Sequence, residues 1–198
     1  MEKQSKITHQ GQIITIKEQK VLKELEELLR EPIPPVSLIN EFSFGFMVKK
    51  DCITGLGLRN KSLKTLPASF GDLVSLKELV LFDNRLKTLP ESFGNLEFLK
   101  YLNLVRNNLI TLPDSFTQLN SLEMLYLNEN NLATLPESFD KLKMLRRLNL
   151  RNNRLITIPN SLLNLLNLEM LWIENNPLDN AAQQILEQLV KKGIYVSK

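Results

Sequence analysis

The residues that could carry covalent or metal chemistry are few in this chain of 198 residues. The one cysteine, Cys52, cannot form an internal disulfide, and we expect it to pack as an inert side chain. The one histidine, His9, cannot by itself build a His-rich metal site or a His-based catalytic triad. The sequence also contains no Gly-x-x-x-x-Gly-Lys-Ser/Thr loop for a nucleotide phosphate. We therefore expect no enzyme activity, no cofactor and no metal.

The charge balance also narrows the classes of partner. The 25 Lys and Arg residues nearly balance the 22 Asp and Glu residues, and a net charge of +3 is too small to indicate nucleic acid or an anionic membrane. The N-terminus has no apolar core of a signal peptide, and no stretch of about 18 apolar residues occurs. These features predict a cytoplasmic protein in a reducing compartment, with no nucleic acid and no membrane among its partners.

Two sets of residues that recur with the same period run through most of the chain. Asparagines and prolines each recur every 23 residues, and leucines hold fixed positions around both. The asparagines are Asn84, Asn107, Asn130, Asn153 and Asn176, and the prolines are Pro67, Pro90, Pro113, Pro136 and Pro159. Such a period indicates a solenoid, in which each repeat forms one coil and stacks on its neighbours.

Each repeat divides into a strand and a return segment. Leucines alternate with variable residues in Leu79-Val80-Leu81, which predicts short parallel strands near Glu78–Phe82 and its equivalents. The return segment, Leu-Pro-x-x-Phe-x-x-Leu, has the apolar spacing of a short 3₁₀ or α turn. We expect its aromatic residues to stack inside the solenoid and each ladder asparagine to bond backbone groups of two coils. The stack comprises Phe70, Phe93, Phe116 and Phe139, with Leu162 in the next coil.

This pattern resembles the leucine-rich repeat superfamily. The 23-residue Leu-Pro-x-x-Phe-x-x-Leu version is similar to the repeats of intracellular Ras-suppressor and Ras-pathway scaffold proteins. The resemblance covers roughly residues 53–178, in six strand-bearing units. It implies an α/β fold, namely a right-handed solenoid with a parallel sheet on its concave face. It also implies a signalling scaffold that binds another protein, with a small GTPase as one candidate partner.

A solenoid exposes its core at both ends, so both ends need caps. At the N-terminal end we predict a cap over residues 13–52. Thr15 and Glu18 fit a capping box that begins a helix, and a hairpin follows, whose second arm is the first repeat strand. The apolar face of this helix comprises Val21, Leu22, Leu25, Leu28 and Leu29. Docking of the helix on a partner or a membrane is the alternative to a cap.

The two chain ends lie outside the repeats. Residues 179–198 are predicted to form a C-terminal cap, with a helix that begins at Asp179 or Asn180 and ends before Gly193. The following residues, 194–196, could add a last extended piece. Residues 1–12 are polar and are predicted to be loose.

The variable strand positions face away from the core, so their composition reports a binding surface. Aromatic, Met and Arg residues gather there, as at protein interfaces. The candidate partner-binding residues are Phe82, Tyr101, Val105, Met124, Tyr126, Arg147, Arg151, Met170 and Trp172. The arginines on this face alternate with acidic residues, which disfavours a nucleic-acid reader. We expect a monomeric interaction module, and the alternative is a structural protein that forms a homodimer through this apolar strip or through a cap.

Overall fold

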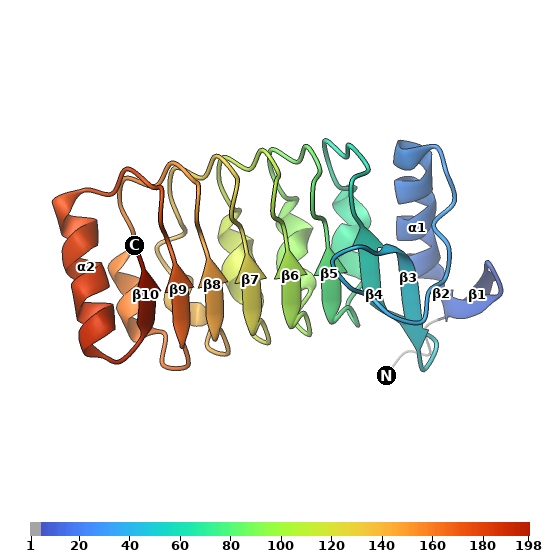
Figure 1. Ribbon diagram of the computed structural model, residues 1–198. Helices are drawn as coiled ribbons and strands as arrows, with labels where there is room; N and C mark the ends of the chain where they lie inside the picture. The colour runs from blue at the N-terminus through green and yellow to red at the C-terminus, as the bar shows by residue number, and fades with distance from the viewer. Residues whose placement is uncertain (1–4) are drawn as a thin grey trace.

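The protein is a curved solenoid in a computed structural model that describes residues 5–198. Within these residues eight strands form one long sheet in the order β10-β9-β8-β7-β6-β5-β4-β3 (Figure 1). The strands are β3 (Phe44–Lys49), β4 (Cys52–Leu58), β5 (Glu78–Val80), β6 (Tyr101–Asn103), β7 (Met124–Tyr126), β8 (Arg147–Asn149), β9 (Met170–Trp172) and β10 (Tyr195–Ser197). Strands β4 to β9 pair in parallel with one register, which confirms the six predicted coils.

The repeat strands are shorter than the predicted Glu78–Phe82 and its equivalents. Backbone bonding between coils nevertheless continues past each strand, and the Asp83 amide donates to the Val105 carbonyl at 2.9 Å. Asp83 itself has a φ of 58°, and the equivalent residue of every later coil is also left-handed. This conformation turns the chain out of the sheet, so the regular strand ends early.

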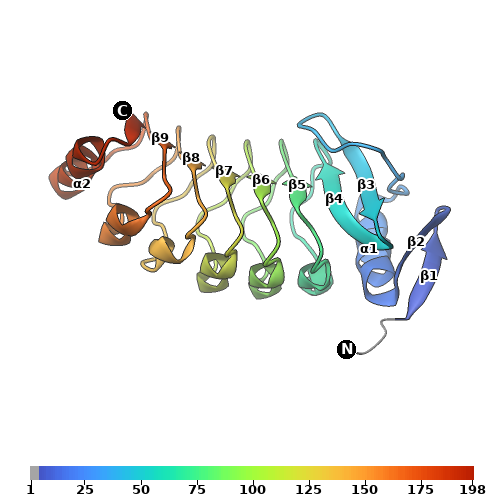
Figure 2. The ribbon, with the colours of Figure 1, turned by 90° about the horizontal axis from the view of Figure 1, so that it is seen from below.

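The return segments lie on the opposite, convex side of the coils, as Figure 2 shows. They form short 3₁₀ helices, which are η1 (Ala68–Asp72), η2 (Glu91–Asn95), η3 (Asp114–Gln118), η4 (Phe139–Lys141) and η5 (Asn160–Asn164). Leucines from both sides fill the space between the sheet and these helices. The main core of the fold therefore runs along the whole array.

The predicted stack of aromatic rings is confirmed over three coils. Phe70 and Phe93 stack at 5.8 Å between ring centroids, and Phe93 and Phe116 stack at 6.1 Å. Phe139 is also fully buried, but among the described residues it forms no stacked pair with Phe116.

The end of the stack coincides with the loss of a glycine. A Cβ on Gly71 or Gly94 would lie only 2.1 Å or 2.4 Å from a serine carbonyl of the next coil, so these coils approach too closely for a side chain. The next coil has Thr117 at this position. Its side chain needs room, which explains why the following ring is not held in the stack.

The predicted asparagine ladder is also confirmed. In each coil the asparagine Nδ2 donates to a carbonyl of its own coil and to one of the preceding coil, and its Oδ1 accepts from a backbone amide of the preceding coil. For Asn107 these partners are Leu104 O (3.1 Å), Leu81 O (2.9 Å) and Leu86 N (3.1 Å). Asn176 forms the same set, but it is only half-buried.

Replacing Asn107 with alanine is expected to lower the free energy of unfolding by about 1–3 kcal/mol, because three buried backbone groups lose their partner. The same change at Asn176 should cost less, because water reaches this end of the ladder. Urea unfolding of both variants measures the difference, with exposed Asn120 replaced by alanine as the control. Equal and negligible losses at Asn107 and Asn176 would refute the rung model.

The N-terminal helix is a cap. Helix α1 (Ile16–Leu29) begins with the predicted capping box, in which Thr15 Oγ1 accepts from the Glu18 amide at 3.2 Å. The buried Glu18 carboxylate also accepts from the Ile53 amide at 2.8 Å, which ties the helix to the first repeat strand. Val21, Leu22, Leu25 and Leu29 pack on the core. Leu28 does not, since 51% of its surface is exposed.

The prediction that residues 1–12 are loose is wrong for residues 6–12, which form most of a hairpin. Residues 1–4 lie outside the described residues. Strands β1 (Lys6–His9) and β2 (Gln12–Thr15) form an antiparallel hairpin. Both residues of its turn, Gln10 and Gly11, have positive φ, as a tight two-residue hairpin turn requires. This turn signal and the buried Ile14 outweigh the polar composition of the segment.

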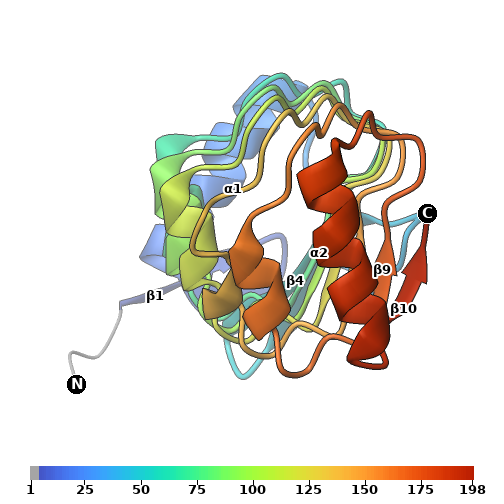
Figure 3. The ribbon, with the colours of Figure 1, turned by 90° about the vertical axis from the view of Figure 1, so that its left-hand side faces the viewer.

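The C-terminal end is closed by helix α2 (Asn180–Lys191), which lies across the last coil in Figure 3. Asp179 caps it by accepting from the Ala182 amide at 2.8 Å. Gly193 follows with a φ of 85°, as predicted for the residue after the helix. The chain then adds β10 parallel to β9, so the predicted last extended piece extends the sheet by one strand.

Candidate protein-interaction face

The strand register places most of the predicted site residues in two columns on the concave face. Residues at the first position of each strand pair directly, so Tyr101, Met124, Arg147 and Met170 follow one another across four coils. In the second column, Tyr126 and Trp172 lie on either side of Asn149. Neighbouring strands are about 4.8 Å apart, so these side chains form one continuous surface.

The aromatic and Met side chains of this surface are partly exposed. Met124, Tyr126, Met170 and Trp172 are half-buried, and Arg147 is exposed. We call these five residues the open patch. The hydrophobic repeat does not require large apolar groups here, because the leucines on the other face of the same strands form the core. The open patch is therefore available to a partner.

Tyr101 joins the open patch to the N-terminal end of the face. Its ring contacts Tyr126 at 5.7 Å between centroids, tilted by 49°. Burial raises the pKa of the Tyr101 hydroxyl, and the carboxylates of Glu41 and Glu78 add to this rise. Tyr101 is thus a neutral, half-buried side chain that separates two regions of the face.

Two predicted site residues are less available than the sequence suggests. Val105 retains only 8% of its surface and cannot act as an exposed anchor. Phe82 is half-buried, with the guanidinium groups of Arg59 and Arg106 at 5.1 Å and 5.7 Å from its ring centroid. The variable position Val80 is completely buried, against Ile39 and Met47. This end of the face belongs partly to a second, small core.

Arg151 is also engaged within the protein. Its Nε lies 2.5 Å from Glu174 Oε2, and its guanidinium lies 6.0 Å from the Trp172 ring centroid. The Ser197 hydroxyl donates to the same carboxylate. Arg151 and Ser197 together lower the pKa of Glu174 to about 2. Arg151 therefore supports Trp172 from the side, and Arg147 is the more available cation.

The lowered pKa of Glu174 predicts an acid-sensitive contribution to stability. A carboxylate with a folded pKa below its ordinary 4.5 stabilises the fold above that pH and loses this contribution as the pH falls toward 2. Glu174→Gln should therefore lower the urea midpoint at neutral pH, and its difference from the parent should shrink near pH 2. Glu137→Gln, at an exposed convex position, is the control. A difference that does not change with pH would contradict the assigned pKa.

Sequence reasoning missed part of this face. Ile39 and Phe42 belong to a loop between α1 and β3, which Figure 2 shows over β3 and β4 on the concave side of the sheet, reaching toward β5. Tyr195 continues the first column beyond Met170, and 57% of its surface is exposed. The loop carries no periodic pattern, whereas the position of Tyr195 follows from the strand register once β10 is recognised.

The residues with reactive side chains lie outside this face. Cys52 is half-buried at the start of β4, and His9 contacts Glu26 at 3.3 Å in the N-terminal cap. Residues 5–198 contain no group of three or more His, Cys, Asp or Glu side chains that could hold a metal ion. In the same described part of the chain, no helix has the length and apolar character needed to cross a membrane.

The fold defines a solenoid repeat protein with a partly exposed sheet face. A family model described as "Leucine-rich repeat region" matches residues 93–191, half of the chain, and a second, "Leucine Rich Repeat", matches residues 75–96. The chain belongs to the leucine-rich repeat superfamily. Repeats of this superfamily generally act as modules for protein–protein interaction, and they are typically non-catalytic.

One solved structure agrees with this assignment. InlP of Listeria monocytogenes is 32% identical over 72% of this chain and 38% of its own, with a TM-score of 0.59. The leucine-rich repeat protein LIC12759 of Leptospira interrogans is 25% identical over 73% of this chain and 54% of its own, with a TM-score of 0.41. This chain thus spans less than two thirds of either protein. A search of curated proteins found no match.

Proposed function

We propose that the protein is a non-catalytic interaction module that binds a partner protein on its concave face. The observation that carries the proposal is the open patch, where three large apolar side chains and Trp172 surround Arg147 on the solvent side of the strands. Trp, Tyr and Arg are the residue types that most often dominate binding energy at protein interfaces. The superfamily supports the same general role.

A small GTPase is the partner class that the repeat resemblance suggests, and a cytoplasmic signalling scaffold is the corresponding role. The resemblance of the 23-residue repeat to those of intracellular Ras-suppressor and Ras-pathway scaffold proteins supports this finer proposal. A binding assay with small GTPases loaded with GDP or with a non-hydrolysable GTP analogue tests it. Nucleotide-dependent binding that Arg147→Ala weakens would support it, and equal, negligible binding in both states would contradict it.

Capture of partners on the immobilised full chain tests the general proposal. The captured proteins should no longer bind a variant with substitutions in the open patch. They should still bind a variant with a substitution at the exposed residue Leu166. Light scattering of the purified protein provides a second criterion. A stable homodimer that the same patch variant dissociates would show that the face serves self-association instead.

A further inference from the structure

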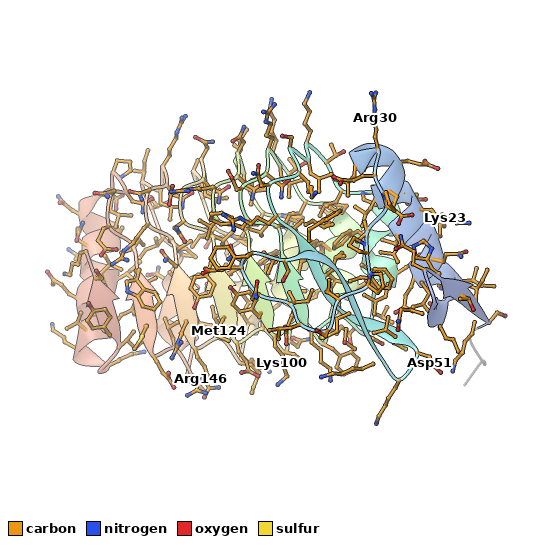
Figure 4. The ribbon with its side chains drawn as sticks, turned by 45° about the vertical axis from the view of Figure 1, so that its right-hand side comes forward. Lys23, Arg30, Asp51, Lys100, Met124 and Arg146 are labelled. Atoms are coloured by element: carbon orange, nitrogen blue, oxygen red, sulfur yellow. The ribbon has the colours of Figure 1, made fainter. Side chains whose placement is uncertain are left out.

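A separate pocket lies at the N-terminal end of the concave face, beneath the overhanging loop. It has a volume of about 600 Å³, within the range of about 300–1,000 Å³ that is usual for pockets that hold small ligands. Ile39 and Phe42 of the loop line one side, and Tyr101 and Met124 of the strands line the other. We call it the loop pocket. Figure 4 labels Met124 on the sheet, with Lys100 and Arg146 along the lower edge.

The loop that lines one side of the pocket is held in place by contacts with the sheet and by a hydrogen bond within the loop. Ile39 is buried beside Val80 and anchors one end. Asn40 Oδ1 accepts from the Phe42 amide at 2.9 Å, which fixes the tip of the loop. The Arg59 guanidinium lies between two rings, 4.8 Å from the centroid of Phe42 and 5.1 Å from that of Phe82. Because these contacts already order the loop in the free protein, little conformational entropy is lost when a ligand binds.

The charges around the pocket favour a cation. The carboxylates of Glu41 on the loop and Glu78 on β5 both raise the pKa of the Tyr101 hydroxyl. Among the described residues, neither carboxylate takes part in an ion pair. Glu123 is neutralised by Lys100 at 2.7 Å. Lys77 is the remaining cation of the lining, and it also borders a second pocket with Lys49 and Lys50. Among the lining residues, two unpaired carboxylates against one ammonium group leave a surplus of one negative charge beside an apolar floor. Arg59, which contacts the Phe42 ring, is not part of this lining.

We infer that the loop pocket binds a segment of the partner protein in which an apolar side chain lies next to a Lys or Arg. The apolar side chain packs between Phe42 and Met124, and the cation reaches Glu41 and Glu78. This inference deepens the proposed function and rests on it, because the pocket adjoins the open patch through Tyr101 and Met124. It assigns the basic part of the partner to one end of the face.

Selection of displayed random short peptides on the full chain tests the inference. Enriched peptides should pair Phe, Leu, Met or Tyr with an adjacent Lys or Arg. Their dissociation constants, measured by fluorescence anisotropy, should rise about tenfold or more in the double variant Glu41→Lys/Glu78→Lys. Met124→Ala should weaken the same peptides through loss of apolar contact.

The matched control is Glu91→Lys/Glu137→Lys, which makes the same charge change at exposed convex positions and should leave peptide binding unchanged. The inference is wrong if no peptide is enriched, if acidic peptides are enriched, or if the loop-pocket variant binds as the parent does while its urea midpoint is normal. If capture still depends on Trp172 in that case, the proposed function stands without this pocket. The proposed function is overturned if capture is unaffected by Trp172→Ala, by Tyr126→Ala and by the loop-pocket variant, while substitutions on the convex side abolish it.

Discussion

Leu125→Ala is expected to lower the free energy of unfolding by about 2–5 kcal/mol, because it opens a cavity in the middle of the core. Leu125 is completely buried at the centre of β7, and it pairs in register with Leu102 and Leu148 of the adjacent strands. Stability in a solenoid depends on contacts between neighbouring coils. A cavity in the central coil therefore weakens two such contacts at once.

Urea unfolding followed by circular dichroism measures this loss. Leu166→Ala is the matched control, since 92% of the Leu166 surface is exposed and the same change there should shift the midpoint little. Equal midpoints for the two variants would mean that the strand leucines do not form the central core, contrary to the fold described above.

The second large effect concerns binding. Trp172→Ala and Tyr126→Ala should each weaken a captured partner by about 2 kcal/mol or more, which corresponds to about a thirtyfold rise in Kd. Both side chains are half-buried on the concave face and contribute little to the leucine core. Their truncation should therefore change the unfolding midpoint little.

A suitable control for the aromatic truncations is Phe98→Ala. Phe98 is an exposed aromatic residue in the turn between η2 and β6, with 59% of its surface accessible. It tests whether loss of any exposed ring weakens binding. A partner that responds to Phe98 and ignores Trp172 would place the interaction on the flank of the solenoid.

The repeat made the centre of this molecule predictable. A period of 23 residues sets which leucines point inward, which side chains pair across strands and where each asparagine bonds, because each coil repeats the geometry of its neighbour. The column that contains Tyr126 and Trp172 could therefore be assigned without coordinates. The capping box at Thr15 and the cap at Asp179 were predictable for a similar reason, since both depend on short local signals.

The features that the sequence did not predict depend on contacts between distant segments or on single local details. The loop with Ile39 and Phe42 is held by Val80 and Arg59, and no periodicity reveals such pairings. The availability of Arg151 is reduced by Glu174, one coil away. The hairpin β1–β2 was not predicted, because the polar composition of the segment indicated a loose chain. Its Gln10-Gly11 turn is nevertheless a sequence signal for a two-residue hairpin turn.

The most direct test of the concave-face proposal is a paired measurement of Kd and urea midpoint for one captured partner at one salt concentration. Trp172→Ala should raise Kd about thirtyfold or more and leave the midpoint near that of the parent. Leu125→Ala should lower the midpoint strongly, and under folding conditions it should retain most of the affinity. If Trp172→Ala and Tyr126→Ala bind as the parent does, while substitutions on the convex side abolish capture, the concave face is not the binding surface.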